Sequence, residues 1–157
     1  MAGTPASGKT CFGDYLRDKK HFLHVDIEEF DGSYLHSVWL AAVKLKEMSL
    51  FLNTLKERTH NAVLTWGFHL DDLQVVADLK KAGVRTWWFE ADEARARERF
   101  IARGGGSIDV FDAQMKRIKN NRGKIEELFQ PNILTTLRPD NSCMTFREIF
   151  EAVRNCR

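Results

Sequence analysis

A glycine-rich segment followed by a lysine and a threonine lies near the start of the 157-residue sequence. The residues from Gly3 to Thr10, GTPASGKT, fit the pattern G-x-x-x-x-G-K-[ST]. In such a loop the backbone N–H groups turn inward to hold phosphate oxygens, a geometry that Cβ atoms at the glycine positions would obstruct. The sequence therefore predicts a phosphate-binding loop made of Gly3, Thr4, Pro5, Ala6, Ser7, Gly8, Lys9, Thr10 and Cys11.

Lys9 and Thr10 carry the side chains that a nucleoside triphosphate needs beside this loop. The ammonium of Lys9 can reach the β- and γ-phosphates as a point charge, and the hydroxyl of Thr10 is placed to coordinate Mg²⁺. The helix that begins here adds the positive end of its dipole. We therefore expect nucleotide binding. The alternative is a glycine-rich turn that caps a helix and binds nothing.

An acidic residue ends the short apolar run HFLHVD, which we predict to be a buried strand. Asp26 would then lie at the edge of the crevice where ligands of open α/β sheets bind. Phosphoryl transfer to a hydroxyl requires a group that orients or deprotonates the acceptor, and Asp26 is the candidate for this role. Glu28 and Glu29 follow closely, and for Glu29 we prefer a solvated loop position.

No Asp or Glu stands at the end of the second predicted strand, where the sequence is TWG over residues 65–67. A separate acidic magnesium residue is therefore missing, unless Asp26 serves through water or the next helix bends Asp71 or Asp72 inward. This pattern favours a small kinase over a motor-type or GTPase-type protein. We expect Trp66 in the strand core, although it lies near the crevice end, where it could stack on a substrate.

Several arginines lie in the segment RARERFIAR. Arg99 and Arg103 are four residues apart on one helix face, so both can point at one phosphate cluster. The glycines at 104–106 follow directly and supply the backbone freedom that the hinge of a closing lid needs. We therefore predict a lid subregion over residues 93–122, and we expect Arg97 to be a solvated helix residue.

Strands and helices alternate along the chain, which implies a parallel sheet covered on both faces. The length suits one domain, residues 1–157. Helices are expected over residues 9–18, 34–58 (one long helix or two joined ones), 70–83, 93–103, 111–129 and 145–154. Strands are expected over residues 21–26, 61–68, 84–92 and 132–137.

The composition is that of an ordinary globular protein, with 43% hydrophobic and 29% charged residues. A net charge of +2 is too small to imply a nucleic acid or an anionic membrane as partner. No stretch approaches the roughly 20 apolar residues that cross a bilayer, so we expect a cytoplasmic protein without a membrane partner. The three cysteines lack disulfide or zinc spacing. The five histidines lack ligand spacing, so core or surface positions are expected for them.

Taken in order, these motifs resemble those of the small P-loop kinases of the adenylate, shikimate and gluconate kinase type, over nearly the whole length. GTPASGKT corresponds to the Walker A loop of that family. HVDIEEF is similar to the strand-end acid pair with which such kinases orient magnesium and the acceptor, here Asp26 and Glu28.

The later motifs carry the resemblance further. EADEARARERFIARG resembles the segment entering the family's lid, with Arg99 and Arg103 facing the phosphates, and FDAQMKRI is similar to a lid-closing stretch with a glutamine, Gln114. LRPDNSCMTFREIFEAV resembles the end of these proteins, where a loop lies against adenine and implicates Arg138, Pro139 and Asp140.

The resemblance implies a three-layer α-β-α fold of P-loop kinase type with a mostly parallel sheet. We expect the first, central strand of that fold to be missing, because only Met1 and Ala2 precede the loop. We expect that the sequence is truncated before the loop. The alternatives are that another segment of the chain, or another chain, occupies the position of this strand. Without that strand, the neighbouring strands would have unpaired backbone N–H and C=O groups, which would reduce stability.

The resemblance also implies an ATP-dependent kinase that uses Mg²⁺ and phosphorylates a hydroxyl of a small-molecule acceptor, as a monomer or dimer. Lys9, Asp26, Arg99 and Arg103 would be catalytic, Thr10 and Asp26 would serve the metal, and Asp26, Glu28 and Trp66 would bind the acceptor. Nucleotide contacts would come from the loop, Arg99, Arg138 and Pro139.

Two further hypotheses stay open. One is a nucleotide-binding protein without turnover, motivated by the missing strand and the missing second acid. The other is a kinase of nucleic-acid ends, or a phosphotransferase acting on an antibiotic or a sugar-nucleotide. The segment KRIKNNRGK supplies basic charge, but no aromatic residues interleave it to stack on bases, which disfavours the nucleic-acid version.

Overall fold

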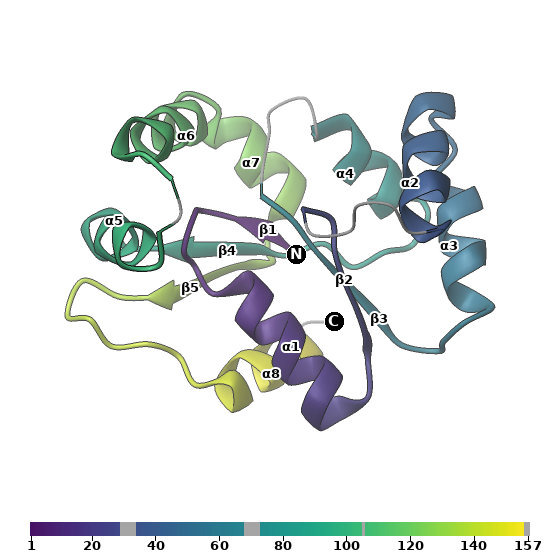
Figure 1. The fold of residues 1–157 in the computed structure, drawn as a ribbon, viewed down its shortest axis with the longest axis horizontal. Coiled ribbons are helices and arrows are strands. Elements are labelled where there is room, and N and C mark those ends of the chain that lie inside the picture. The colour runs from purple at the N-terminus through teal and green to yellow at the C-terminus, as the bar shows by residue number, and fades with distance from the viewer. Residues whose placement is uncertain (29–33, 68–72, 105, 156–157) are drawn as a thin grey trace. The chain divides into compact units, whose positions relative to one another are not determined.

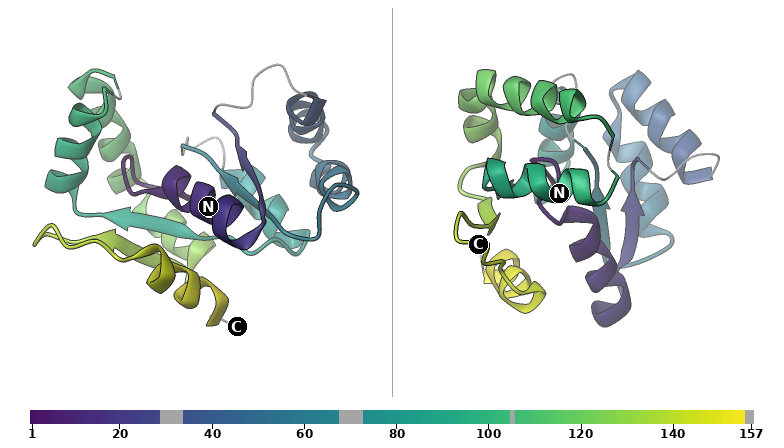
Figure 2. Two further views of the ribbon diagram at one scale, coloured as in Figure 1. Left: turned by 60° about the horizontal axis from the view of Figure 1, so that its bottom comes forward. Right: turned by 60° about the vertical axis from the view of Figure 1, so that its left-hand side comes forward.

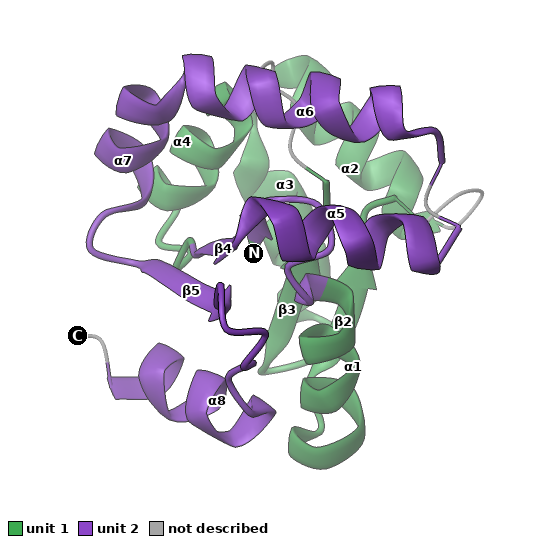
Figure 3. Cartoon of the chain, turned by 90° about the vertical axis from the view of Figure 1, so that its left-hand side faces the viewer, with its two compact units in different colours: residues 1, 10–86 green, residues 2–9, 87–157 purple. Residues whose placement is uncertain are grey.

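The computed structural model describes residues 1–28, 34–67, 73–104 and 106–155 (Figure 1). The chain divides into two compact units, coloured separately in Figure 3. The first unit consists of Met1 and Thr10–Thr86, and the second of Ala2–Lys9 and Trp87–Arg157. The single domain expected from the length stays a prediction.

The first unit is built around two parallel strands. Its elements are α1 (Lys9–Lys20), β2 (Leu23–Asp26), α2 (Tyr34–Leu45), α3 (Met48–Lys56), β3 (Ala62–Thr65) and α4 (Leu73–Lys81). In the β2–β3 register, His24 lies beside Val63 and Asp26 beside Thr65. The backbone carbonyl of Met1 accepts a hydrogen bond from Trp66 N, and its terminal amine donates to the carbonyl of Leu64.

The apolar stretch predicted over residues 34–58 forms two helices, the second of the two expected arrangements. The break falls at Lys46, whose φ of 57° lies in the left-handed region and cannot continue a helix. Aromatic packing holds the pair to the strands: the Trp39 ring lies edge-on to Phe51 at 5.1 Å and tilted against Trp66 at 6.0 Å.

The second unit contains three parallel strands in the order β1-β4-β5. The strands are β1 (Ala2–Gly3), β4 (Trp88–Ala91) and β5 (Ile133–Leu137), and the helices are α5 (Glu93–Ala102), α6 (Ile108–Asn120), α7 (Arg122–Phe129) and α8 (Phe146–Asn155). Figure 2 shows α5 and α6 side by side. The core includes Trp88 against Phe129 and Phe100 against Phe111, each pair 5.4 Å apart.

Local hydrogen bonds explain where the helices of the second unit begin and end. Asp92 caps α5 by accepting from Arg95 N at 3.1 Å. The helix predicted over residues 111–129 begins earlier, at Ile108, and is divided at Asn121, whose side chain donates to the carbonyl of Arg117. Thr145 and Glu148 form a reciprocal capping box before α8.

The strand predicted to be missing before the loop is present in reduced form. Ala2 and Gly3 form β1 and pair with Trp88 and Phe89 of β4, and Ala2 is only 1% exposed. Two residues suffice to make the backbone pairs that lead into the loop. The predicted α/β class with parallel strands is confirmed. Within the described residues, no helix is long and apolar enough to cross a membrane.

Candidate functional site

The phosphate-loop segment starts where β1 pairs in parallel with β4. Thr4 N donates to the carbonyl of Phe89 at 2.9 Å. A Cβ on Gly3 would lie 2.1 Å from that same carbonyl oxygen, so the backbones can approach this closely only because residue 3 is glycine. The first glycine of the motif therefore anchors the loop to the sheet of the second unit.

The middle of the loop contains two left-handed residues. Ala6 has φ of 56° and Gly8 has φ of 87°. Left-handed residues that follow right-handed ones turn successive N–H groups to one side, which makes a concave anion site. The carbonyl of Ser7 accepts from Thr136 Oγ1 on β5 at 2.7 Å. These two left-handed residues fit the predicted phosphate loop, and its binding of phosphate stays a prediction.

Thr136 is a supporting residue that the sequence did not reveal. Its hydroxyl lies 2.7 Å from the carbonyl of Ser7 and 3.0 Å from that of Glu90, and its single proton can serve either one. Ser7 is 129 residues away in the chain. No local pattern in the run NILTTL marks one threonine over its neighbour.

Lys9 lies over the loop rather than in solvent. It is 9% exposed, and its Nζ lies 3.0 Å from the carbonyl of Thr4, 3.4 Å from that of Gly3 and 3.5 Å from Ser7 Oγ. Charge-assisted hydrogen bonds from a lysine ammonium to phosphate oxygens are the contacts that the predicted role of Lys9 requires. The first turn of α1 contains no acidic residue of its own, so the positive end of the helix dipole adds to the attraction for an anion.

Thr10 and Asp26 meet within the first unit. Thr10 Oγ1 donates to Asp26 Oδ2 at 2.9 Å, and Glu28 N donates to Asp26 Oδ1 at 3.1 Å. The two side chains predicted to serve the metal therefore lie within hydrogen-bond distance of each other. Mg²⁺ usually binds through one or two protein oxygens, substrate phosphates and water, so these two side chains fit that ion. The described residues contain no group of three or more His, Cys, Asp or Glu that would form a metal cage.

Glu28 and Trp66 lie at the ends of the two strands of the first unit. Glu28 is exposed, yet a Cβ on Gly67 would lie 2.2 Å from Glu28 Oε1, so the carboxylate rests against that glycine. Trp66 is only 7% exposed and packs against Trp39. Its contact with an acceptor stays a prediction. Glu29, Asp71 and Asp72 lie outside the described residues.

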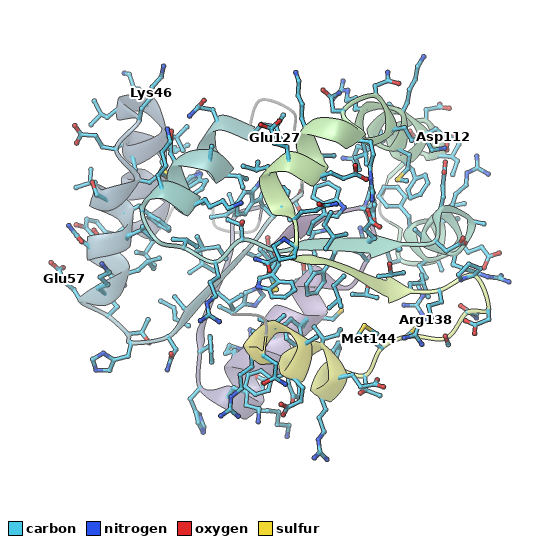
Figure 4. All side chains as sticks on the ribbon, turned by 180° about the vertical axis from the view of Figure 1, so that it is seen from behind. Lys46, Glu57, Asp112, Glu127, Arg138 and Met144 are labelled. Carbon is cyan, nitrogen blue, oxygen red and sulfur yellow. The ribbon has the colours of Figure 1, made fainter. Side chains whose placement is uncertain are left out.

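The predicted lid arginines have partners within the second unit. Arg99 Nη2 donates to Cys143 Sγ at 2.8 Å, and the guanidinium of Arg103 lies 5.3 Å from the centre of the Phe100 ring. Arg97, expected to be solvated, makes an exposed ion pair with Asp112 on α6. Asp112 is labelled in Figure 4. The ion pair between Arg97 and Asp112 therefore joins two helices of the predicted lid. The sequence did not predict this link.

The segment after β5 contains the residues that the resemblance assigned to adenine. Arg138 is exposed and labelled there in Figure 4, and its N–H donates to the carbonyl of Ser142. The carbonyl of Pro139 accepts from Arg95 Nε at 3.3 Å. Hydrogen bonds from the Ser142 hydroxyl and amide lower the pKa of the Asp140 carboxyl below its usual range. The hydrogen bonds from Arg95 to Pro139 and from Arg99 to Cys143 connect α5 with this segment.

No protein-family model matches the sequence, and a search of curated proteins likewise gives no match. Among solved structures the chain is similar to shikimate kinase from Bacteroides thetaiotaomicron. The sequence identity is 14% and the TM-score is 0.49, over 98% of this chain and 91% of that chain. What this chain binds is therefore inferred from its own residues.

Proposed function

We propose that this chain is an ATP-dependent kinase that transfers the γ-phosphoryl group to a hydroxyl of a small molecule. The observation that carries the proposal is the folded loop: Lys9 Nζ over its carbonyls, and the next residue, Thr10, bonded to Asp26. A lysine that follows a glycine-rich loop suits phosphate, and a hydroxyl bonded to a carboxylate suits Mg²⁺, which supports the proposal. A turn that only capped a helix would not need these polar side chains.

Each residue has a role that its chemistry supports. The loop amides and Lys9 would bind the phosphates, while Thr10 and Asp26 would hold Mg²⁺, which neutralises charge on the transferring group when bound. The Asp26 carboxylate would orient the acceptor hydroxyl and accept its proton. Arg99 and Arg103 would exchange their present partners for phosphate oxygens, with Arg138 and Pro139 beside the base. The protein would gain most of its rate from positioning and electrostatics.

Nucleotide binding is tested by titrating Mg-ATP into the parent chain, a Lys9→Ala variant and a Lys19→Ala control, using calorimetry. Lys19 lies exposed at the other end of α1, so the two variants lose the same charge from the same helix. Hydrogen bonds to charged groups contribute about 1.5–3 kcal/mol. We therefore expect Lys9→Ala to weaken binding by about ten- to a hundredfold, and Lys19→Ala to leave it unchanged. Equal affinities for all three proteins would refute the loop assignment.

Turnover is tested by ADP release from Mg-ATP in the presence of a panel of hydroxyl compounds, with an Asp26→Asn variant beside the parent. Asparagine keeps an acceptor oxygen for Thr10 but cannot take a proton at neutral pH. We expect an acceptor-dependent rate that Asp26→Asn lowers by about 10²–10⁴-fold, as for loss of a general base. Binding without release of ADP under any acceptor would favour the nucleotide-binding protein without turnover.

A further inference from the structure

A buried histidine links three elements of the first unit. The His24 side chain is 4% exposed. Its Nδ1 lies 3.1 Å from Asp14 Oδ1 on α1, and its Nε2 lies 2.8 Å from Thr65 Oγ1 at the end of β3. Both ring nitrogens therefore have partners, which a buried imidazole requires.

The partners determine how the protons are arranged. An ionised carboxylate only accepts hydrogen bonds, so Nδ1 carries the proton and donates to Asp14. In the neutral ring Nε2 is then an acceptor, and the hydroxyl of Thr65, which is fully buried, donates to it. For a neutral ring beside an ionised Asp14, this assigned tautomer satisfies both contacts, and the histidine connects a helix to two strands.

The contact between Asp14 and His24 repeats, one turn away, the contact between Thr10 and Asp26. Thr10 and Asp14 are four residues apart on α1, a rise of about 6 Å. His24 and Asp26 are two residues apart on one face of β2, a rise of about 6.6 Å. Because the two spacings nearly match, the polar pairs form successive links between the same helix and the same strand.

Gly13 lies between these links and allows the close approach. A Cβ at this position would lie 2.3 Å from His24 Nε2 and 2.6 Å from each neighbouring ring carbon. The imidazole therefore rests directly on the backbone of α1. Any residue larger than glycine would push the ring, and β2 with it, away from the helix.

We infer that His24, held by Asp14, is a positioning residue for the Thr10–Asp26 pair, an inference that rests on the proposed function. His24 acts by fixing the distance between α1 and β2, so that the hydroxyl and the carboxylate lie where Mg²⁺ needs them. It has no role in holding the phosphates, which belongs to the loop amides and Lys9.

The test compares Asp14→Ala with Asp18→Ala. Both residues lie on α1 and both pair with Arg17; Asp14 is half-buried and Asp18 is exposed, and of the two only Asp14 contacts His24. Calorimetry gives the affinity for ATP with Mg²⁺ and for ATP with EDTA, and the ratio of the two is the gain due to the metal. A merely structural role would change both affinities together and leave the ratio constant.

We expect Asp14→Ala to reduce this ratio by about tenfold, as for removal of an outer partner of a metal-binding group. Asp18→Ala should leave it unchanged. Asp14→Asn should restore it, because the amide oxygen still accepts from Nδ1–H. Gly13→Ala, which displaces the ring while keeping every polar group, should reduce the ratio as Asp14→Ala does.

The outcomes separate the two proposals. If the parent binds Mg-ATP more tightly than ATP with EDTA and Asp14→Ala keeps that ratio, the positioning role of His24 is wrong and the proposed function stands. If the parent binds ATP in neither condition, the proposed function fails and takes this inference with it. Asp14 is 41% exposed, so the Asp14→Ala variant tests the link without emptying the core at His24.

Discussion

Single residues decide how closely the backbones of this protein approach one another. Gly3 is the sharpest case, because the atom that a Cβ would meet is the carbonyl oxygen of Phe89, which cannot rotate away. Gly123 on α7 is the opposite case, since a Cβ there would meet no atom within 4 Å. The two glycines thus offer a matched pair of substitutions.

We expect Gly3→Ala to lower the free energy of unfolding by about 1–3 kcal/mol, the usual cost of overpacking. The same substitution should weaken nucleotide binding, because the loop starts at this contact. Gly123→Ala should instead raise stability by roughly 0.5–1 kcal/mol, since alanine costs less than glycine in a helix. Urea unfolding of both variants checks this, and a stable Gly3→Ala would contradict the close approach.

The loop and Asp26 could be inferred from the sequence because each rests on a short local pattern. GTPASGKT marks the loop, and an acid after an apolar run marks the strand end. The contacts of Thr136 and Cys143 could not be inferred in this way. Their partners, Ser7 and Arg99, are 129 and 44 residues away in the chain. Such partners depend on how the strands pair, which no local spacing encodes.

At the scale of elements, periodicity predicted the helices well and their interruptions poorly. Apolar residues keep helical spacing across Lys46 and across Asn121, so the hydrophobic pattern reads as continuous at both places. The breaks come from backbone conformation: Lys46 is left-handed and Asn121 has φ of −115°. Helical periodicity records which face is buried, and it is insensitive to one residue that leaves the helix.

The start of α8 should depend on pH. The Glu148 carboxylate accepts hydrogen bonds from Thr145, and these lower its pKa below the ordinary value of 4.5. The bond from the Thr145 N–H has the larger effect and the bond from its hydroxyl the smaller. A carboxyl whose pKa is lower in the folded state than in the unfolded state stabilises the fold at pH values above its unfolded pKa. This stabilisation is lost as the pH falls through the folded-state pKa. We therefore expect the first turn of α8 to lose helical structure in acid, which the backbone NMR chemical shifts of α8 would report.

The Glu148→Gln variant provides the comparison for this expectation. Glutamine can accept from the same N–H without titrating, so its α8 shifts should vary little below pH 4.5. An equal acid response in parent and variant would assign the change to other carboxylates.

At the scale of the whole chain, each unit includes residues distant in sequence. The second unit takes Ala2–Lys9 together with Trp87–Arg157, and the first takes Met1 together with Thr10–Thr86. The alternation of strands and helices predicted the class of fold, because it depends on composition along the chain. It could not predict this division, which depends on which strands pair.

Deleting Met1 and Ala2 should therefore affect both units. Trp66 N would lose the carbonyl of Met1, and the carbonyl of Trp87 would lose the N–H of Ala2. Each buried backbone group left unpaired costs about 1–3 kcal/mol. We expect a lower unfolding midpoint and faster hydrogen exchange at the Trp66 amide. Unchanged exchange at that amide would show that Met1 contributes nothing to β3.

The placement of the tryptophans gives the protein its own optical reporters. All four are buried, Trp39 and Trp66 in the first unit and Trp87 and Trp88 in the second. Replacing one pair by phenylalanine would leave intrinsic fluorescence from the other unit alone. Emission recorded during denaturation would then show, without any added dye, whether the two units melt together or in separate steps.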